Sequence, residues 1–139
     1  MTATKRILAT LVGFVTYFLL GWLIFGLLLM DFYADQTTEA AKAVWRPEGE
    51  MIWWALLVSN LFMAYLLVYI FSKWESVRTF SSGLMAGMTI AIIIGIAIDA
   101  MFYASYDMMG LTGYAVDIIA NAVLVGLTGG VIAWFLGRK

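Results

Sequence analysis

Two aspartates lie inside long apolar stretches of this 139-residue chain, and their positions are the first hint of chemistry. Asp99 lies about two turns from the outer end of one stretch. Asp117 lies in the next stretch, four residues before Asn121, so these two side chains share a helix face. Asn60 has a comparable depth in an earlier stretch. At about 1.5 Å per residue, all four lie roughly 7–14 Å below the outer membrane surface.

Acidic side chains at such depths are candidate functional groups. A carboxyl group near the centre of a membrane helix costs about 2.5–3.5 kcal/mol to insert. Two neighbouring carboxyls in low dielectric do not both ionise, so at least one is expected to keep its proton near neutral pH. The pattern predicts an outward-facing polar pocket that binds a cation, a proton or an amine-bearing molecule. Its predicted residues are Asp99, Asp117, Asn121, Asn60 and Tyr103.

The alternative is that these side chains form neutral contacts that fix the register of the helices. A protonated carboxyl facing an asparagine amide makes an interhelical hydrogen bond. Such bonds contribute only about 0.6–2 kcal/mol in membranes, which barely offsets the cost of inserting the acid. The sequence leaves both interpretations open.

Several classes of chemistry are excluded by composition. The chain has no Cys and no His, which removes disulfides, haem ligation and ordinary zinc or copper sites, and no metal or cofactor is expected. A net charge of −1 leaves no basic surface for nucleic acid. No catalytic triad or phosphate-binding loop is present. Asp99 and Asp117 could formally act as an aspartyl protease pair, but their flanks lack the Gly-Asp pattern of intramembrane proteases, so a non-enzymatic protein is expected.

The elements that hold these residues are membrane spans. Apolar residues make up 64% of the chain and charged residues 12%, with a mean hydropathy of +0.96. Soluble domains contain about 45–50% apolar and about 25% charged residues. Continuous rather than alternating apolar stretches favour helices over a barrel. We therefore predict an all-α, four-helix transmembrane bundle forming a single domain over 1–139, with spans at about 7–30, 51–72, 82–106 and 112–136.

The basic residues predict the orientation of the bundle. Six of the eight flank the predicted inner ends of the spans, which places both termini in the cytoplasm. The outer loop, residues 31–50, holds the stretch Thr37–Trp45. We expect it to form a short interfacial helix, capped by Asp35 or Thr37 and ended before Pro47.

Small residues predict how the helices pack. The third span has small residues every four positions up to Asp99, and the fourth span carries several glycines. Such faces let two helix backbones approach closely in lipid. Because the connection between these spans is short, they should be antiparallel neighbours. The predicted packing residues are Gly83, Gly87, Gly95, Gly126 and Gly130.

Three stretches resemble a group of small four-span bacterial membrane proteins for which no activity is established. They are Leu19-Leu20-Gly21-Trp22, Met30-Asp31-Phe32-Tyr33 and Ile70-Phe71-Ser72-Lys73-Trp74. The resemblance implies a four-helix fold in the bacterial cytoplasmic membrane.

Two functions remain after these exclusions. The first is a ligand-binding or assembly subunit in the membrane, with lipids, copies of itself or another membrane protein as partners. The second is an oligomeric cation- or proton-coupled transporter or channel that uses Asp99 and Asp117, since an acidic outer face concentrates cations. A cation or small amine is the expected ligand in either case.

Overall fold

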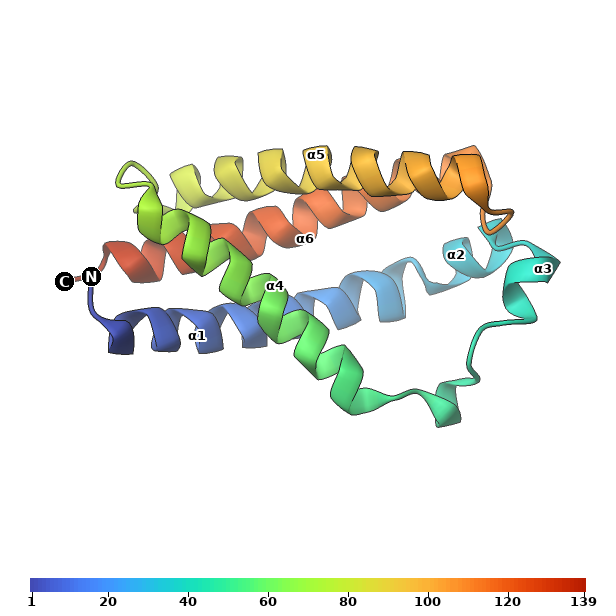
Figure 1. Ribbon diagram of the computed structural model, residues 1–139, viewed down its shortest axis with the longest axis horizontal. Helices are drawn as coiled ribbons and strands as arrows, with labels where there is room; N and C mark the ends of the chain where they lie inside the picture. The colour runs from blue at the N-terminus through green and yellow to red at the C-terminus, as the bar shows by residue number, and fades with distance from the viewer.

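The computed structural model describes all residues from 1 to 139 and is helical throughout. Six α-helices, one π-helical segment and one 3-10 turn follow one another along the chain (Figure 1). Their bounds are α1 Ala3–Gly21, η1 Trp22–Leu28, α2 Met30–Gln36, α3 Glu39–Lys42, η2 Glu48–Glu50, α4 Trp53–Lys73, α5 Phe80–Ser105 and α6 Leu111–Gly137.

Four segments are long and apolar enough to cross a membrane, which confirms the prediction of an all-helical chain with four helices that could span one. Each has at least 21 residues, and a hydrocarbon core of about 30 Å requires about 20. The spans are Ala3–Leu28, which joins α1 to η1, then Trp53–Lys73, Phe80–Ser105 and Leu111–Gly137.

The turn between α4 and α5 is fixed by side-chain hydrogen bonds. Thr79 and Ser82 form a capping box at the start of α5, in which each hydroxyl oxygen accepts a bond from the other residue's backbone N–H. The guanidinium of Arg78 satisfies carbonyl oxygens at the end of α4 and in the turn. It donates to the carbonyls of Phe71, Trp74 and Val77, at 2.7–2.8 Å.

The α5–α6 hairpin is the most closely packed part of the bundle (Figure 1). A Cβ on Gly87 would lie 2.5 Å from the carbonyl oxygen of Val125, and one on Gly129 would lie 2.6 Å from that of Gly83. Only a hydrogen at these positions allows the two backbones to touch. The two helices are antiparallel neighbours, as their short connection predicts.

The second helix pair is more open. α1 lies along α6 and also contacts α4, which crosses it at an angle and diverges from the rest of the bundle toward its own N-terminus (Figure 1). On α4, buried residues occur only between Ala64 and Phe71. The core therefore lies toward the end of the bundle that carries both termini, where Leu67, Val68 and Ile132 are fully buried.

The first span is not the continuous helix that its sequence predicts. The α-helix gives way to π-helical geometry at Trp22, and the N–H of Leu29 bonds to the carbonyl of Ile24, five residues back, at 2.9 Å. Leu29 itself leaves helical geometry, with φ −110° and ψ 6°. The apolar run contains no proline, and Gly26 is the only residue in η1 that disfavours a helix. Hydropathy therefore carried no signal of this break.

The loop after α2 is tied to the α5–α6 connection. The backbone N–H of Thr38 donates to the carbonyl of Met108 at 3.0 Å, and its hydroxyl donates to the carbonyl of Asp107 at 2.6 Å. The N–H of Gly110 donates to the carbonyl of Gln36 at 3.3 Å. These bonds attach the end of α2 to the far end of the hairpin.

The helix expected at Thr37–Trp45 is shorter than predicted. It is α3, and its cap is Thr38, whose hydroxyl oxygen accepts from the N–H of Ala41 at 3.2 Å. The predicted cap at Asp35 or Thr37 is wrong, because Asp35 lies within α2 and the Thr37 hydroxyl donates to the carbonyl of Tyr33 at 2.6 Å.

Candidate functional site

A pocket of about 230 Å³ lies where the four spans meet. Its polar residues come from three helices: Tyr17 from α1, Asp99 from α5, and Asp117 and Asn121 from α6. Apolar side chains of α4 and α5 complete the wall, among them Met63, Ile90, Ile94 and Ile98. Since α4 and α5 scarcely touch each other, the pocket lies at the gap between these two helices.

The hairpin brings the two predicted aspartates together. Asp99 and Asp117 lie on facing helices and line the same pocket. They are eighteen residues apart in the sequence, and the antiparallel packing of α5 on α6 brings them into the same pocket.

The two carboxyl groups have different surroundings. Both oxygens of Asp117 accept hydrogen bonds: Oδ1 from the Tyr33 hydroxyl at 2.7 Å, and Oδ2 from the Asn121 amide at 3.2 Å. The same amide also donates to the Asp117 backbone carbonyl at 3.0 Å. In contrast, Oδ2 of Asp99 is buried and has no hydrogen-bond partner, and it is the only buried side-chain polar atom of the chain in this state. A buried acceptor without a partner costs about 1–3 kcal/mol, which a donor from a ligand or a proton shared with Asp117 would offset.

Tyr33 is a site residue that sequence reasoning missed. It belongs to α2, beyond the first span, and it reaches Asp117 only because the chain breaks at Leu29 and α2 then lies against α6. Burial and the hydrogen bond to Asp117 raise the pKa of the Tyr33 phenol well above its usual value. Its hydroxyl therefore keeps its proton and acts as a donor to the carboxylate. No local signal marks this contact, because it depends on a backbone break that hydropathy does not reveal.

Tyr17 is a second residue that the sequence analysis missed. It lines the pocket from α1 and lies near Asp117. A tyrosine in the middle of an apolar span was the available signal, since its polar hydroxyl needs a partner when it is away from water.

Two predicted site residues lie apart from the pocket. Asn60 is half-buried on α4 but does not line it, and Met63 of the next turn does so instead. Tyr103 is 52% exposed, and its ring packs edge-on against Tyr114 at 5.9 Å. Asn60 lies outside because α4 diverges from the bundle in the half that carries it.

The predicted packing glycines lie between α5 and α6. Gly83 and Gly87 face the α6 backbone, and a Cβ on Gly95 would lie 3.3 Å from Ile118. From the other side, a Cβ on Gly126 would approach the side chain of Met88, and one on Gly130 the ring of Phe80. This interface sets the relative position of α5 and α6, and so the approach of Asp99 to Asp117.

The donor set limits what the site can hold. The chain has no cluster of three or more His, Cys, Asp or Glu side chains. Two carboxyl groups, one amide and two phenols suit a proton, a monovalent cation or an amine better than a transition metal. Comparison with known protein families, curated proteins and solved structures finds no match to this chain.

Proposed function

We propose that this chain is a non-enzymatic integral membrane protein that binds a small amine-bearing ligand in the pocket between its four spans. The observation that carries the proposal is the buried, unpartnered Oδ2 of Asp99 next to a fully hydrogen-bonded Asp117. An ammonium group has three donors and a positive charge, and an unsatisfied carboxylate oxygen in low dielectric is a favourable partner for both.

The rest of the pocket favours an organic amine over a bare ion. At about 230 Å³ it is larger than a single ion needs, and most of its lining is apolar. Ligand sites of this kind combine an apolar wall with a few polar groups that fix orientation. The isoleucines of α5 would contact the hydrocarbon part of the ligand, while Asp99 holds the ammonium group.

We further propose a bacterial cytoplasmic membrane as the location, with both termini in the cytoplasm; the charge distribution supports this orientation. Both termini lie at one end of the bundle, and six of the eight basic residues belong to that end (Figure 1). At the opposite end, the loop that contains α3 is rich in acids and carries exposed Val44 and Trp45. We propose that this loop lies on the outer membrane surface, with these two side chains at the interface.

The second candidate function is cation- or proton-coupled transport by an oligomer. The observation in its favour is that two carboxyl groups on facing helices line one pocket, where a substrate cation could displace a proton held by the pair. Four helices are too few to enclose a complete pathway, so transport requires several copies of the chain. A homo-oligomer or a partner membrane protein would then cover the exposed faces of α4 and α5.

The test is amine binding to purified protein in lipid nanodiscs, measured by calorimetry with cyclohexylamine as the probe. Asp99→Asn should weaken binding at least tenfold, because the amide cannot act as a counter-ion; a tenfold loss corresponds to about 1.4 kcal/mol. Asp107→Asn removes an exposed acid of the outer loop and serves as the matched control. Cyclohexanol, which lacks the charge, should bind neither the wild type nor the variants.

Three results would overturn the proposal: equal affinity in both variants, equal binding of cyclohexanol, or no binding to a folded wild-type protein. Thermal unfolding of each variant shows that it is folded. In proteoliposomes, an amine-dependent proton flux that disappears in both Asp99→Asn and Asp117→Asn would favour transport over simple binding.

A further inference from the structure

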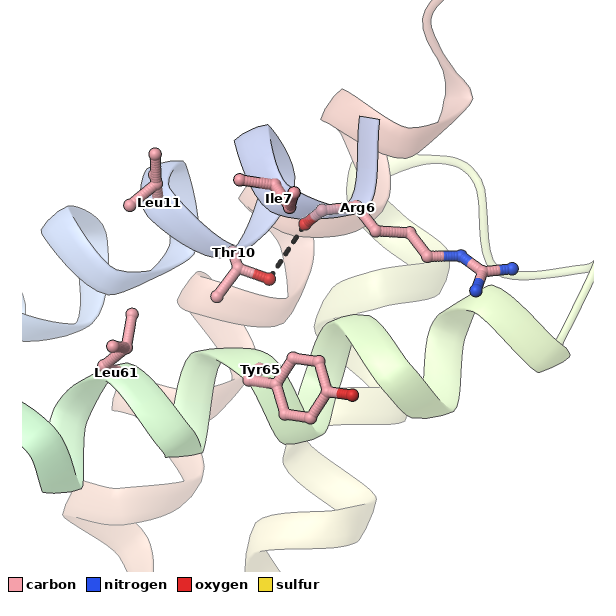
Figure 2. Close-up of a pocket in the computed structure, with 6 residues that line it drawn as sticks. All are labelled: Arg6, Ile7, Thr10, Leu11, Leu61 and Tyr65. Atoms are coloured by element: carbon pink, nitrogen blue, oxygen red, sulfur yellow. Dashed lines mark hydrogen bonds between the residues drawn. The ribbon is translucent and has the colours of Figure 1, made fainter. Parts of the chain in front are cut away.

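A second depression lies toward the terminal end of the bundle. It is a groove of about 220 Å³ between α1 and α4 (Figure 2). Its lining residues are Arg6, Ile7, Thr10, Leu11, Leu61 and Tyr65. None of these residues lines the aspartate pocket, so the groove is independent of the function proposed above.

The groove has a polar end and an apolar end. Figure 2 shows the Arg6 guanidinium and the Tyr65 hydroxyl toward the same end, while Leu11 and Leu61 lie toward the opposite end. The Tyr65 ring is held between its neighbours Phe62 and Tyr69, each with a ring centroid 6.3 Å away. Thr10 uses its hydroxyl proton in a bond to the Arg6 carbonyl at 2.8 Å, so Arg6 and Tyr65 are the free donors.

Arg6 differs from four of the five other basic residues at this end because its side chain has no partner within the chain. Lys139 has no partner either, but it does not line the groove. Arg78 donates to three carbonyls, and Lys5 donates to the carbonyl of Arg138. Lys73 lies over the ring of Tyr69, and Arg138 over that of Trp134. The Arg6 guanidinium makes no hydrogen bond, ion pair or cation–π contact, which leaves all five of its N–H donors available.

Charge complementarity indicates the occupant. This end of the bundle carries six basic side chains and one acidic side chain, Glu75, and none of them forms a salt bridge. An arginine binds a phosphate in a bidentate manner, and basic sites between helices near a membrane surface bind anionic lipid headgroups. The apolar end of the groove continues toward the membrane interior, as an acyl chain does.

We propose that the groove between α1 and α4 binds one anionic phospholipid. Its phosphate accepts hydrogen bonds from the Arg6 guanidinium and the Tyr65 hydroxyl, and an acyl chain lies between Leu11 and Leu61. The lipid fills the space between two helices that are otherwise in contact over only part of their length.

The proposal is tested by native mass spectrometry of the full chain, titrated in detergent with dimyristoyl phosphatidylglycerol. Arg6→Gln should weaken binding of the first lipid about fivefold, since a basic residue near an anionic surface contributes about 1 kcal/mol. Tyr65→Phe should weaken it by a smaller factor. Lys139→Gln removes the same charge at the same end but outside the groove, and it should leave the affinity unchanged. Leu61→Trp, which fills the apolar end, should also reduce binding.

Arg6 is exposed and has no side-chain partner, so its substitution should not affect folding; the melting temperature checks this. Equal losses in Arg6→Gln and Lys139→Gln would overturn the proposal in favour of diffuse attraction to a basic surface. Equal affinity for dimyristoyl phosphatidylcholine would show that headgroup charge is not recognised. Displacement of the lipid by millimolar inorganic phosphate would identify a soluble anion as the occupant.

Discussion

The α5–α6 hairpin and the α1–α4 pair are built from helices of nearly equal hydropathy, yet they pack in opposite ways. The mean hydropathy of the four spans lies between 2.0 and 2.2. In the hairpin, glycines bring the two backbones into contact along much of their length. α4 contains no glycine, and it crosses α1 at an angle and then diverges from it. Closeness of packing in this protein therefore follows the distribution of small residues rather than apolar content, as expected where lipid is as apolar as the side chains.

The difference between the two pairs creates the candidate site. The tight hairpin brings Asp99 next to Asp117, whereas the divergence of α4 leaves space beside them. Had α4 packed as closely as α6, apolar side chains would fill that space.

The largest expected effect on the free energy of unfolding comes from replacing glycines in the α5–α6 hairpin and in α1 with alanine, which adds one methyl group. In Gly83→Ala the new Cβ would overlap the backbone carbonyl of Gly129, which cannot move without displacing α6. We expect a loss of about 2–3 kcal/mol, the upper part of the range for overpacking. In Gly13→Ala the Cβ would meet Ile132 Cδ1 at 2.6 Å, which is a side-chain atom and not backbone, so the loss should be smaller. Reversible unfolding in mixed micelles measures both.

Gly21→Ala is the matched control for this series. Its nearest atom would be Leu124 Cδ2 at 3.7 Å, an ordinary contact, and alanine is the better helix former by about 1 kcal/mol. This variant should be as stable as the wild type or more stable. A Gly83→Ala protein no less stable than Gly13→Ala would contradict the close backbone contact in the hairpin.

An intermediate effect is expected at the contact that ties the first span to α6. Tyr33→Phe removes the hydroxyl that donates to Asp117 at 2.7 Å, at a cost of about 1 kcal/mol. The effect should depend on pH. Because the pKa of Tyr33 is higher in the folded protein than its usual value of about 10, its contribution is complete below pH 10 and is lost as the pH rises above it.

The measurement is the difference in unfolding free energy between wild type and Tyr33→Phe at pH 8 and above pH 10. The difference should shrink at the higher pH, since only the wild type can lose the Tyr33 proton. A difference that grows above pH 10, or that is absent at pH 8, would show that the hydrogen bond does not hold α2 on α6.

The smallest effect on stability is expected in the loop that contains α3. Lys42 and Glu39 form the only salt bridge of the chain, with 3.4 Å between Nζ and Oε1, and the Glu39 side chain is 92% exposed. Exposed pairs of this type contribute little. Glu39→Gln should therefore leave the unfolding free energy unchanged within about 0.5 kcal/mol, and a larger loss would indicate that α3 is buried against a partner.

Much of the fold could be predicted from the sequence because the bilayer imposes strong, local constraints. An uninterrupted apolar run must become a helix, since no water is present to satisfy its backbone. The four spans and the antiparallel α5–α6 pair follow from run lengths, a short connection and glycine spacing. The break at Leu29 could not be predicted, because a π-helical segment leaves no mark on hydropathy.

The candidate site, like the fold, could be predicted from the sequence only in part. The sequence by itself determined that Asp99 and Asp117 lie within spans and that Asn121 shares a face with Asp117, since these facts depend only on position along one helix. Tertiary structure alone decided that Tyr33 satisfies Asp117, that Asn60 lies outside the pocket, and that Asp99 keeps an unpartnered oxygen. The reason is physical: helix formation depends on neighbours in the chain, whereas the surroundings of a buried carboxyl depend on the angle between helices and on which side chains are small enough to let them meet.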